Sequence, residues 1–229
     1  MKIFNFGLDI EPGKYKYKSK EFEKLVEKFS PQKVSPYSVE FVDIEAETAD
    51  AIVFDINKKI DLILIDLEKI EKRLLRSEDE GEKELLARSQ KALEEEKLLC
   101  DIEFSAQEAQ TLTMLQLVTY KPCLGEEKCD KVNELIEKVI DSAGILLFFT
   151  AGKKEVRAWS IKKGESVLEA AGKIHSDLKR GFIKADIVKA CDLDSFFNMA
   201  EARAKGFVKI VDRDYIVQEG DVIEIRFSV

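Results

Sequence analysis

Three stretches near the carboxyl end decide the fold: FFTAGKKEVRAWSIKKG (148–164), AAGKIHSDLKRGFIKADIV (170–188) and DYIVQEGDVIEIRF (214–227). Apolar runs and alternation predict strands, and three- and four-residue spacing predicts helices. The strands are expected at 146–150, 156–161, 182–188, 215–218 and 222–227, and the helices around 167–171 and 193–204. A strand hairpin, a helix and further strands closing one mixed sheet are typical of a β-grasp domain in the α+β class. We expect this domain at 145–229.

Upstream of this domain the chain first favours strands and then long helices. Strands are expected at 2–7, 14–18, 39–44 and 51–56, with a short helix at 22–29, while 121–130 has the composition of a loop. Leucine and isoleucine recur at helical spacing over 58–76 and 82–99, on either side of a polar break. Two such helices predict an antiparallel coiled-coil arm. Ser105, three residues before Glu108, predicts a capping box that opens a third helix.

Charge is distributed unevenly along the 229 residues. The formal net charge is -8, but residues 145–229 carry 15 basic and 13 acidic side chains. A uniformly acidic chain would argue against binding nucleic acid, so only the last third is expected to face phosphates. The balance of 37 Lys and Arg and 45 Asp and Glu against few Asn and Gln favours a heat-adapted source.

Membrane, export and metal classes have little support in the sequence. No apolar run reaches the roughly 18 to 20 residues of a membrane helix, and acids occupy the amino-terminal stretch where a signal peptide would be apolar. We therefore expect a cytoplasmic protein without a membrane partner. Four cysteines form no disulfide framework, and Cys123 and Cys129 are separated by five residues, unlike common zinc pairs. We expect reduced thiols and no metal.

One segment invites interpretation as a phosphate-binding loop. GLDIEPGK (7–14) ends in Gly13 and Lys14, but five residues separate its glycines where the P-loop has four, and Tyr15 replaces the Ser or Thr that binds magnesium. Asp43 follows an apolar strand, as a Walker B aspartate would. Gly13, Lys14 and Asp43 are therefore weak candidates for nucleotide binding.

The remaining candidates lie in the last third. His175 is the sole histidine, and no serine, cysteine or carboxylate stands at a recognisable catalytic spacing to it, so no catalytic residue is expected. Basic residues interleaved with aromatics suit phosphate contact, although a solvated sheet face would have the same composition. The expected RNA or ribosome contacts are Arg157, Trp159, Lys162, Lys163, Lys179, Arg180 and Lys184.

The three carboxyl-terminal stretches closely resemble the TGS domain of the YchF family, the Obg-like ATPases. DLEKIEKRL (66–74) resembles the family's coiled-coil arm, LQLVTYKP (115–122) its return into the nucleotide-binding domain, and KIFNFGL (2–8), QKVSPYSVEFVDI (32–44) and TADAIVFDI (48–56) its strands. The resemblance implies an α/β remnant of a P-loop GTPase-like domain at 1–56 and 118–144. It also implies an inserted coiled-coil arm at 57–117 and a β-grasp (TGS) domain at 145–229.

Departures from the family pattern concern every loop that touches nucleotide. After Leu8 the chain passes directly to PGKYKYKSKEFEKL, so the P-loop, the next helix and switch I are missing. The family's DxxG is here Asp43-Ile44-Glu45-Ala46, and CLGEEKC (123–129) replaces the strand and base-specificity motif. The remnant has 83 residues, whereas a doubly wound NTPase sheet needs roughly 150. We expect no complete phosphate site, no cofactor and no catalysis.

These departures lead to one main expectation and two alternatives. The main one is a non-catalytic regulatory or binding protein that reaches the ribosome or structured RNA through the TGS domain and the arm, because the family is ribosome-associated. One alternative retains ATP or GTP binding and slow hydrolysis at an unorthodox site using Lys14 or Asp43. The other is a scaffold whose exposed sheet edge pairs with another protein or a second copy.

Overall fold

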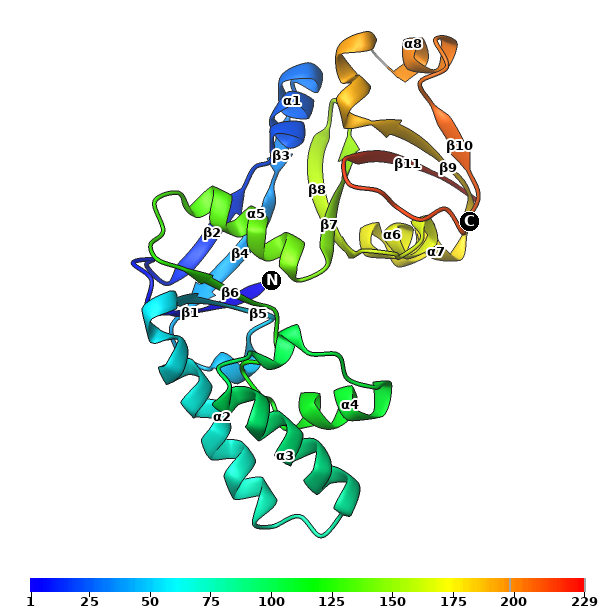
Figure 1. The fold of residues 1–229 in the computed structure, drawn as a ribbon. Coiled ribbons are helices and arrows are strands. Elements are labelled where there is room, and N and C mark those ends of the chain that lie inside the picture. Colours follow the sequence, from blue (N-terminus) through cyan, green and yellow to red (C-terminus); the bar gives the residue numbers. More distant parts are fainter. Residues whose placement is uncertain (198, 229) are drawn as a thin grey trace. The chain divides into compact units, whose positions relative to one another are not determined.

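The computed structural model describes residues 1–197 and 199–228, which form two compact units (Figure 1). Unit 1 comprises 1–15 and 39–143, and unit 2 comprises 16–38 and 144–229. Within the part of the chain described, no helix combines the length and the apolarity needed to cross a membrane.

Unit 1 is built on a five-stranded sheet in the order β2-β4-β1-β5-β6. The strands are β1 (Lys2–Phe6), β2 (Gly13–Tyr17), β4 (Tyr37–Val42), β5 (Ala51–Asp55) and β6 (Cys123–Glu126). β1 pairs in parallel with β4 and β5, and β5 pairs in parallel with β6. β1 and β5 are nearly continuous apolar runs because central parallel strands are covered on both faces.

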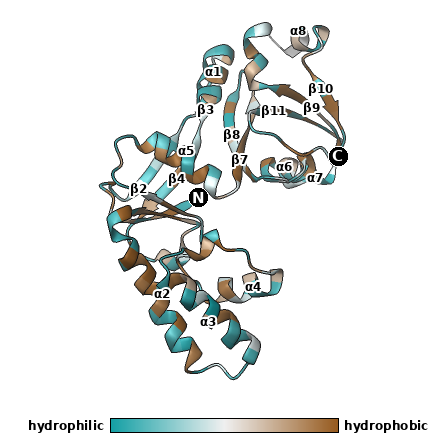
Figure 2. Cartoon of the chain, viewed as in Figure 1, coloured by the Kyte–Doolittle hydropathy of each residue, from teal (hydrophilic) through white to brown (hydrophobic). Residues whose placement is uncertain are grey.

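Helices complete the core of unit 1. They are α2 (Lys59–Leu74), α3 (Glu80–Glu94), α4 (Ala106–Met114) and α5 (Val132–Ser142). α2 and α3 pack together as a helical hairpin, with Leu62, Ile70 and Leu86 fully buried. Apolar and polar residues are interspersed along both helices (Figure 2). The Ser105–Glu108 capping box opens α4 as expected.

Unit 2 is a six-stranded mixed sheet in the order β10-β9-β11-β7-β8-β3. The strands are β3 (Lys33–Ser35), β7 (Ile145–Ala151), β8 (Glu155–Lys162), β9 (Phe182–Lys189), β10 (Lys209–Val211) and β11 (Asp221–Phe227). β7 and β8 form an antiparallel hairpin, and β11 lies parallel to β7 and antiparallel to β9.

Each face of this sheet packs against helices. α6 (Val167–Ile174) buries Val167 and Ala170 against Phe148 on one face, next to α7 (Ser176–Arg180). α1 (Lys20–Phe29) buries Phe22, whose ring lies 6.1 Å from that of Phe149, on the other. The unit also holds α8 (Met199–Ala204).

The structure differs from the sequence expectations in several segments. The single helix expected at 193–204 is a 3-10 helix over Ala190–Ser195 and then α8, with Phe196 in an extended conformation after the first of them. Residues 16–38, expected with the amino-terminal remnant, belong to unit 2, because α1 packs on β7 and β8 and β3 adds a strand parallel to β8. The expected loop at 121–130 contains β6, which gains its order from pairing with β5. The expected strand at 215–218 is a single bridge between Ser166 and Ile216, because Asp221 accepts hydrogen bonds from the Tyr215 hydroxyl and the Gln218 N–H and holds the segment as a turn.

Candidate functional site

The loop that leaves β1 folds back onto the protein. The Asn5 amide donates hydrogen bonds to the carbonyls of Leu8 (2.9 Å) and Ile10 (3.1 Å), and its oxygen accepts one from the Leu8 N–H (3.2 Å). The Leu8 and Ile10 side chains are buried. A phosphate cradle needs several main-chain N–H groups pointing outward together. Here the N–H groups of Leu8 and Ile10 are already bonded, and the apolar side chains of these two residues are buried.

The element after this loop is a strand and not a helix. Phosphate loops end at a helix N-terminus, whose free N–H groups and dipole attract the anion. Here β2 begins at Gly13, and the next helix, α1, begins at Lys20 and belongs to unit 2. Lys14 is exposed on β2. The aliphatic part of Lys58 covers Gly7, since a Cβ at that glycine would lie 2.6 Å from Lys58 Cδ.

The link between β4 and β5 is short and is held by lysines. Lys121 Nζ donates to the carbonyls of Glu47 (2.8 Å) and Ala49 (2.6 Å), and Lys69 forms an ion pair with Glu47 (3.0 Å). Lys2 Nζ donates to Thr48 Oγ1 (2.8 Å). The hydrogen bond from Lys69 lowers the pKa of Glu47, and burial lowers the pKa of Lys121. This link is therefore tied to unit 1 at several points.

Asp43 does not reach this network of lysine contacts. It lies exposed after β4, at the edge where the parallel strands of unit 1 end. The same edge carries Asp55, whose Oδ1 accepts from the Asn57 N–H (2.9 Å), and Glu126, which is paired with Lys138. Ligands of open α/β sheets bind at this edge. Among residues 1–197 and 199–228, no three His, Cys, Asp or Glu side chains are grouped to hold a metal ion.

Asp66 on α2 is a buried carboxylate that the sequence reasoning missed. It accepts hydrogen bonds from the N–H groups of Val118 (2.8 Å) and Thr119 (2.7 Å) and from the Thr119 hydroxyl (2.6 Å). Burial raises its pKa in spite of these bonds. The polar residue between apolar positions of α2 was the available signal. Asp66 fastens the helical hairpin to the segment that returns to the sheet, which is a structural role.

Three of the basic residues expected to meet phosphate form ion pairs within unit 2. Lys179 binds Glu169 (2.8 Å), Arg180 binds Asp177 (2.8 Å), and Lys184 binds Asp212 (3.0 Å). Each surface pair has part of its charge compensated by its neighbour. His175 Nδ1 accepts a hydrogen bond from the Asp177 N–H (3.2 Å), so it caps the short α7.

Arg157 and Trp159 form the one aromatic–basic pair of that set. The Arg157 guanidinium lies 3.9 Å from the centre of the Trp159 ring, which stacks on Phe148 and donates a hydrogen bond to Thr150 (3.0 Å). Both are half-buried. The guanidinium is thus held over an aromatic ring, and both groups are of the kind that stacks on bases.

The seven expected contacts do not form one patch. Trp159 packs against the core on the α6 face of the sheet, and Arg157 shares that face by alternation along β8. Lys184 alternates with the core residue Ala185 and therefore belongs to the opposite face. Lys162 and Lys163 are exposed at the end of β8. The structure brings Arg157 and Trp159 together and separates Lys184 from them.

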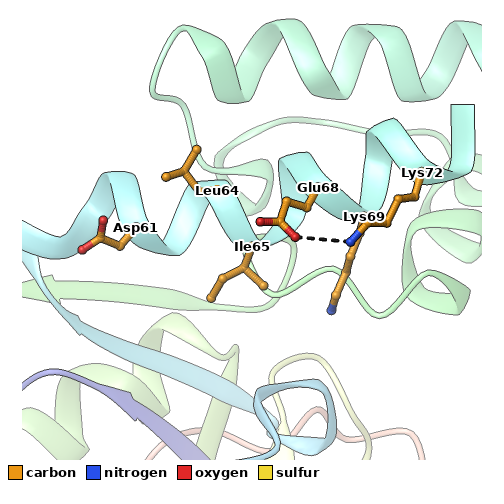
Figure 3. A pocket seen from close by; sticks show the side chains of 6 residues that line it. All are labelled: Asp61, Leu64, Ile65, Glu68, Lys69 and Lys72. Carbon is orange, nitrogen blue, oxygen red and sulfur yellow. Dashed lines mark hydrogen bonds and ion pairs between the residues drawn. The ribbon is translucent and has the colours of Figure 1, made fainter.

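A shallow hollow lies along α2 in unit 1 (Figure 3). It is lined by Asp61, Leu64, Ile65, Glu68, Lys69 and Lys72. Glu68 and Lys72 form an ion pair at 3.3 Å. All six residues come from one helix, and Ile60 and Leu64 leave about half of their surface exposed beside them (54% and 49%). Such a mixed helix face suits contact with a macromolecule better than enclosure of a small molecule.

Comparisons with known proteins agree with this architecture. The family model YchF-GTPase_C, described as a protein of unknown function (DUF933), matches residues 145–228. The Bacillus subtilis (strain 168) protein named ribosome-binding ATPase YchF is 31% identical over 237 residues, covering 74% of this chain and 65% of its own length. The chain belongs to the YchF/Obg-like ATPase family. The zebrafish (Danio rerio) protein of the family, Obg-like ATPase 1, is 39% identical over 118 residues, covering 48% of this chain and 30% of its own.

The fold of this YchF-family chain also matches a solved structure. The structure of the Schizosaccharomyces pombe YchF GTPase superposes with a TM-score of 0.75 and 17% identity, covering 95% of this chain and 88% of that one. The alignment with the Bacillus protein is 237 positions long. This chain has 229 residues, and only 74% of them are covered by that alignment. That relative therefore has segments without a counterpart here. The chain spans about two thirds of the Bacillus relative and under a third of the zebrafish one.

Proposed function

We propose that this YchF-family chain is a non-catalytic binding protein whose nucleotide-binding loops were removed by deletion. The observation that carries the proposal is the path after β1, where a loop closed by Asn5 leads into a strand in place of a helix N-terminus. The β4–β5 link held by Lys2, Lys69 and Lys121 supports it, because a nucleotide-sensing switch has to move between two positions. The gaps against the Bacillus relative are consistent with such deletions.

Nucleotide titration tests the absence of the site. We expect no heat on adding ATP or GTP with magnesium up to millimolar ligand, and no nucleotide copurifying with the protein. The Bacillus relative, which is named an ATPase, is the positive control in the same buffer. Saturable micromolar binding would overturn the proposal and favour a retained hydrolase. Loss of that binding in Lys14→Ala or Asp43→Ala would then locate the site.

The second part of the proposal is that the protein associates with ribosomes through a β-grasp, TGS-like unit 2, aided by the α2–α3 hairpin. Several relatives are named ribosome-binding. The Arg157–Trp159 pair offers a stacking surface on β8, and the exposed Lys162 and Lys163 lie at the end of the same strand. A ribosomal partner also implies a cytoplasmic location.

Cosedimentation with ribosomes over a salt series tests this part. Contacts to phosphate release counterions, so binding should fall steeply as salt rises. Arg157→Gln combined with Lys162→Gln should weaken binding severalfold and lower the salt slope by about one for each lost phosphate contact. Arg180→Gln is the matched control, because that side chain is paired with Asp177. Binding that survives high salt and both substitutions would indicate an apolar protein interface instead.

The edge strands of the unit 1 sheet are β2 and β6. An edge strand can pair with a second copy of the chain, which is the scaffold alternative. A mass measured over a range of protein concentrations distinguishes that scaffold from a monomer. A concentration-independent monomer mass would remove the scaffold and leave the ribosome proposal unaffected.

A further inference from the structure

Two cysteines of unit 1 meet in a part of the structure that the proposed function does not use. Cys100 lies in the short 3-10 helix η3 (Leu99–Asp101), and Cys123 is the first residue of β6. The Cys100 main chain and the Cys123 thiol both contact the Thr119 carbonyl, which brings the two residues together. Both are partly exposed and line one open hollow together with Phe104, Tyr120 and Pro122.

The backbone fixes both cysteines independently of their thiols. The Cys100 N–H donates to the Thr119 carbonyl at 2.8 Å, and the Ile52 N–H donates to the Pro122 carbonyl at 2.9 Å. Cys123 Sγ lies 4.0 Å from the same Thr119 oxygen that binds Cys100. Asp66 holds the Thr119 N–H from the other side. Both cysteines are thus held around one carbonyl, and a disulfide requires such proximity.

The two thiols differ in reactivity. The neighbouring Cys123 lowers the pKa of Cys100, and the neighbouring Cys100 together with burial raises the pKa of Cys123. The thiolate is the reactive form of cysteine. Cys100 is therefore the attacking group, and Cys123 is the resolving one beside it.

We propose that Cys100 and Cys123 are an oxidation site at which a peroxide forms an intramolecular disulfide between η3 and β6. The Cys100 thiolate attacks one oxygen of hydrogen peroxide, the O–O bond breaks, and the product is the Cys100 sulfenic acid; the hydroxide released takes up the proton that left the thiol, giving water. The Cys123 sulfur then attacks the sulfenic sulfur, and the hydroxyl leaves as a second water with the Cys123 proton. Both thiols are oxidised by one electron, and the peroxide is reduced by two.

Peptide mapping of the native protein tests this site directly. After mild treatment with hydrogen peroxide and blocking of free thiols, cleavage at glutamate separates the two cysteines into the peptides 97–103 and 109–126. We expect these two peptides to be joined, and to separate on reduction. The remaining cysteines, Cys129 and Cys191, serve as internal controls that stay alkylatable at the same peroxide dose. A linkage from Cys100 to another cysteine, or oxidation of Cys191 while the pair remains free, would overturn the proposal.

Single substitutions separate the two roles. In Cys123→Ser, Cys100 has no resolving partner, so a sulfenic-acid trap such as dimedone should label it severalfold more than in the wild type. In Cys100→Ser, Cys123 should resist the same dose, whereas Cys191→Ser should leave the disulfide yield unchanged. Equal peroxide sensitivity of Cys100→Ser and Cys123→Ser would contradict the assigned order of attack. The mapping on unsubstituted protein stands even if a variant folds poorly.

Discussion

Removal of the Asp66 carboxylate should destabilise unit 1 selectively. Asp66→Ala leaves three donors without their acceptor: the N–H groups of Val118 and Thr119 and the Thr119 hydroxyl. Each unsatisfied buried donor costs about 1–3 kcal/mol. Relief from burying a charged carboxylate offsets part of this sum, so the expected loss is about 3–5 kcal/mol, as for other broken buried charge networks.

The two units can be followed separately in one denaturation experiment. Trp159 is the only tryptophan and lies in unit 2, so its fluorescence reports that unit. Far-UV circular dichroism also follows α2 to α5, which lie in unit 1. Asp66→Ala should move the dichroism transition to lower urea and leave the Trp159 transition in place, and Val118 and Thr119 should exchange their amide hydrogens faster.

Glu71→Ala is the matched control, since Glu71 is exposed on the same helix. It should change stability by less than about 0.5 kcal/mol. If Asp66→Ala cost no more than this control, the carboxylate would not be fastening the hairpin to residues 118–119, and the reasoning would fail.

Three further substitutions test other parts of the structure. Phe22→Ala should destabilise unit 2 by about 3–5 kcal/mol, measured by Trp159 fluorescence, because Phe22 is buried against Phe149; an effect on unit 1 alone would contradict the assignment of 16–38. Asn5→Ala should cost about 1–3 kcal/mol in unit 1 by opening the loop after β1, and unchanged stability would show that the loop closes without it. For Asp186, burial alone would raise the pKa, but hydrogen bonds from Arg226 and Arg203 lower it below the usual value. The stabilising effect of ionised Asp186 is therefore present above the unfolded-state pKa and lost as pH falls through the folded-state pKa. The difference in unfolding free energy between the wild type and Asp186→Asn should shrink below about pH 4. A difference that stays constant from pH 6 to pH 2.5 would refute this.

Strands with strong apolar patterns could be predicted from the sequence, and features that depend on distant partners could not. β7, β8, β9 and β11 were expected within two residues of their observed bounds, because alternation along each strand matches its two faces. β6 has only four residues and little apolar character, and it exists because β5 offers a parallel partner. At 215–218, apolar alternation predicted a strand, but the Asp221 carboxylate captures this segment as a turn.

The candidate site shows the same limit. The wrong spacing in GLDIEPGK was visible in the sequence, but closure of the loop by Asn5 was not, because a side chain that bonds its own backbone leaves no periodic signal. Composition alone indicates the basic residues. Which of them pair with Glu169, Asp177 or Asp212 depends on the way that helices and strands pack in unit 2.

The insertion of α1 and β3 into unit 2 has a consequence for the order in which the protein can fold during synthesis. The Ser35 hydroxyl donates a hydrogen bond to the Glu155 carboxylate at 2.6 Å, and the two residues are 120 positions apart in the sequence. Helix α1 is synthesised long before β7 and β8. Phe22 and Leu25 therefore stay exposed until those two strands have been made. A fragment beginning at residue 144 would lack this segment altogether and would expose the Phe149 face of its sheet, so the smallest self-sufficient piece that contains unit 2 also includes its amino-terminal part.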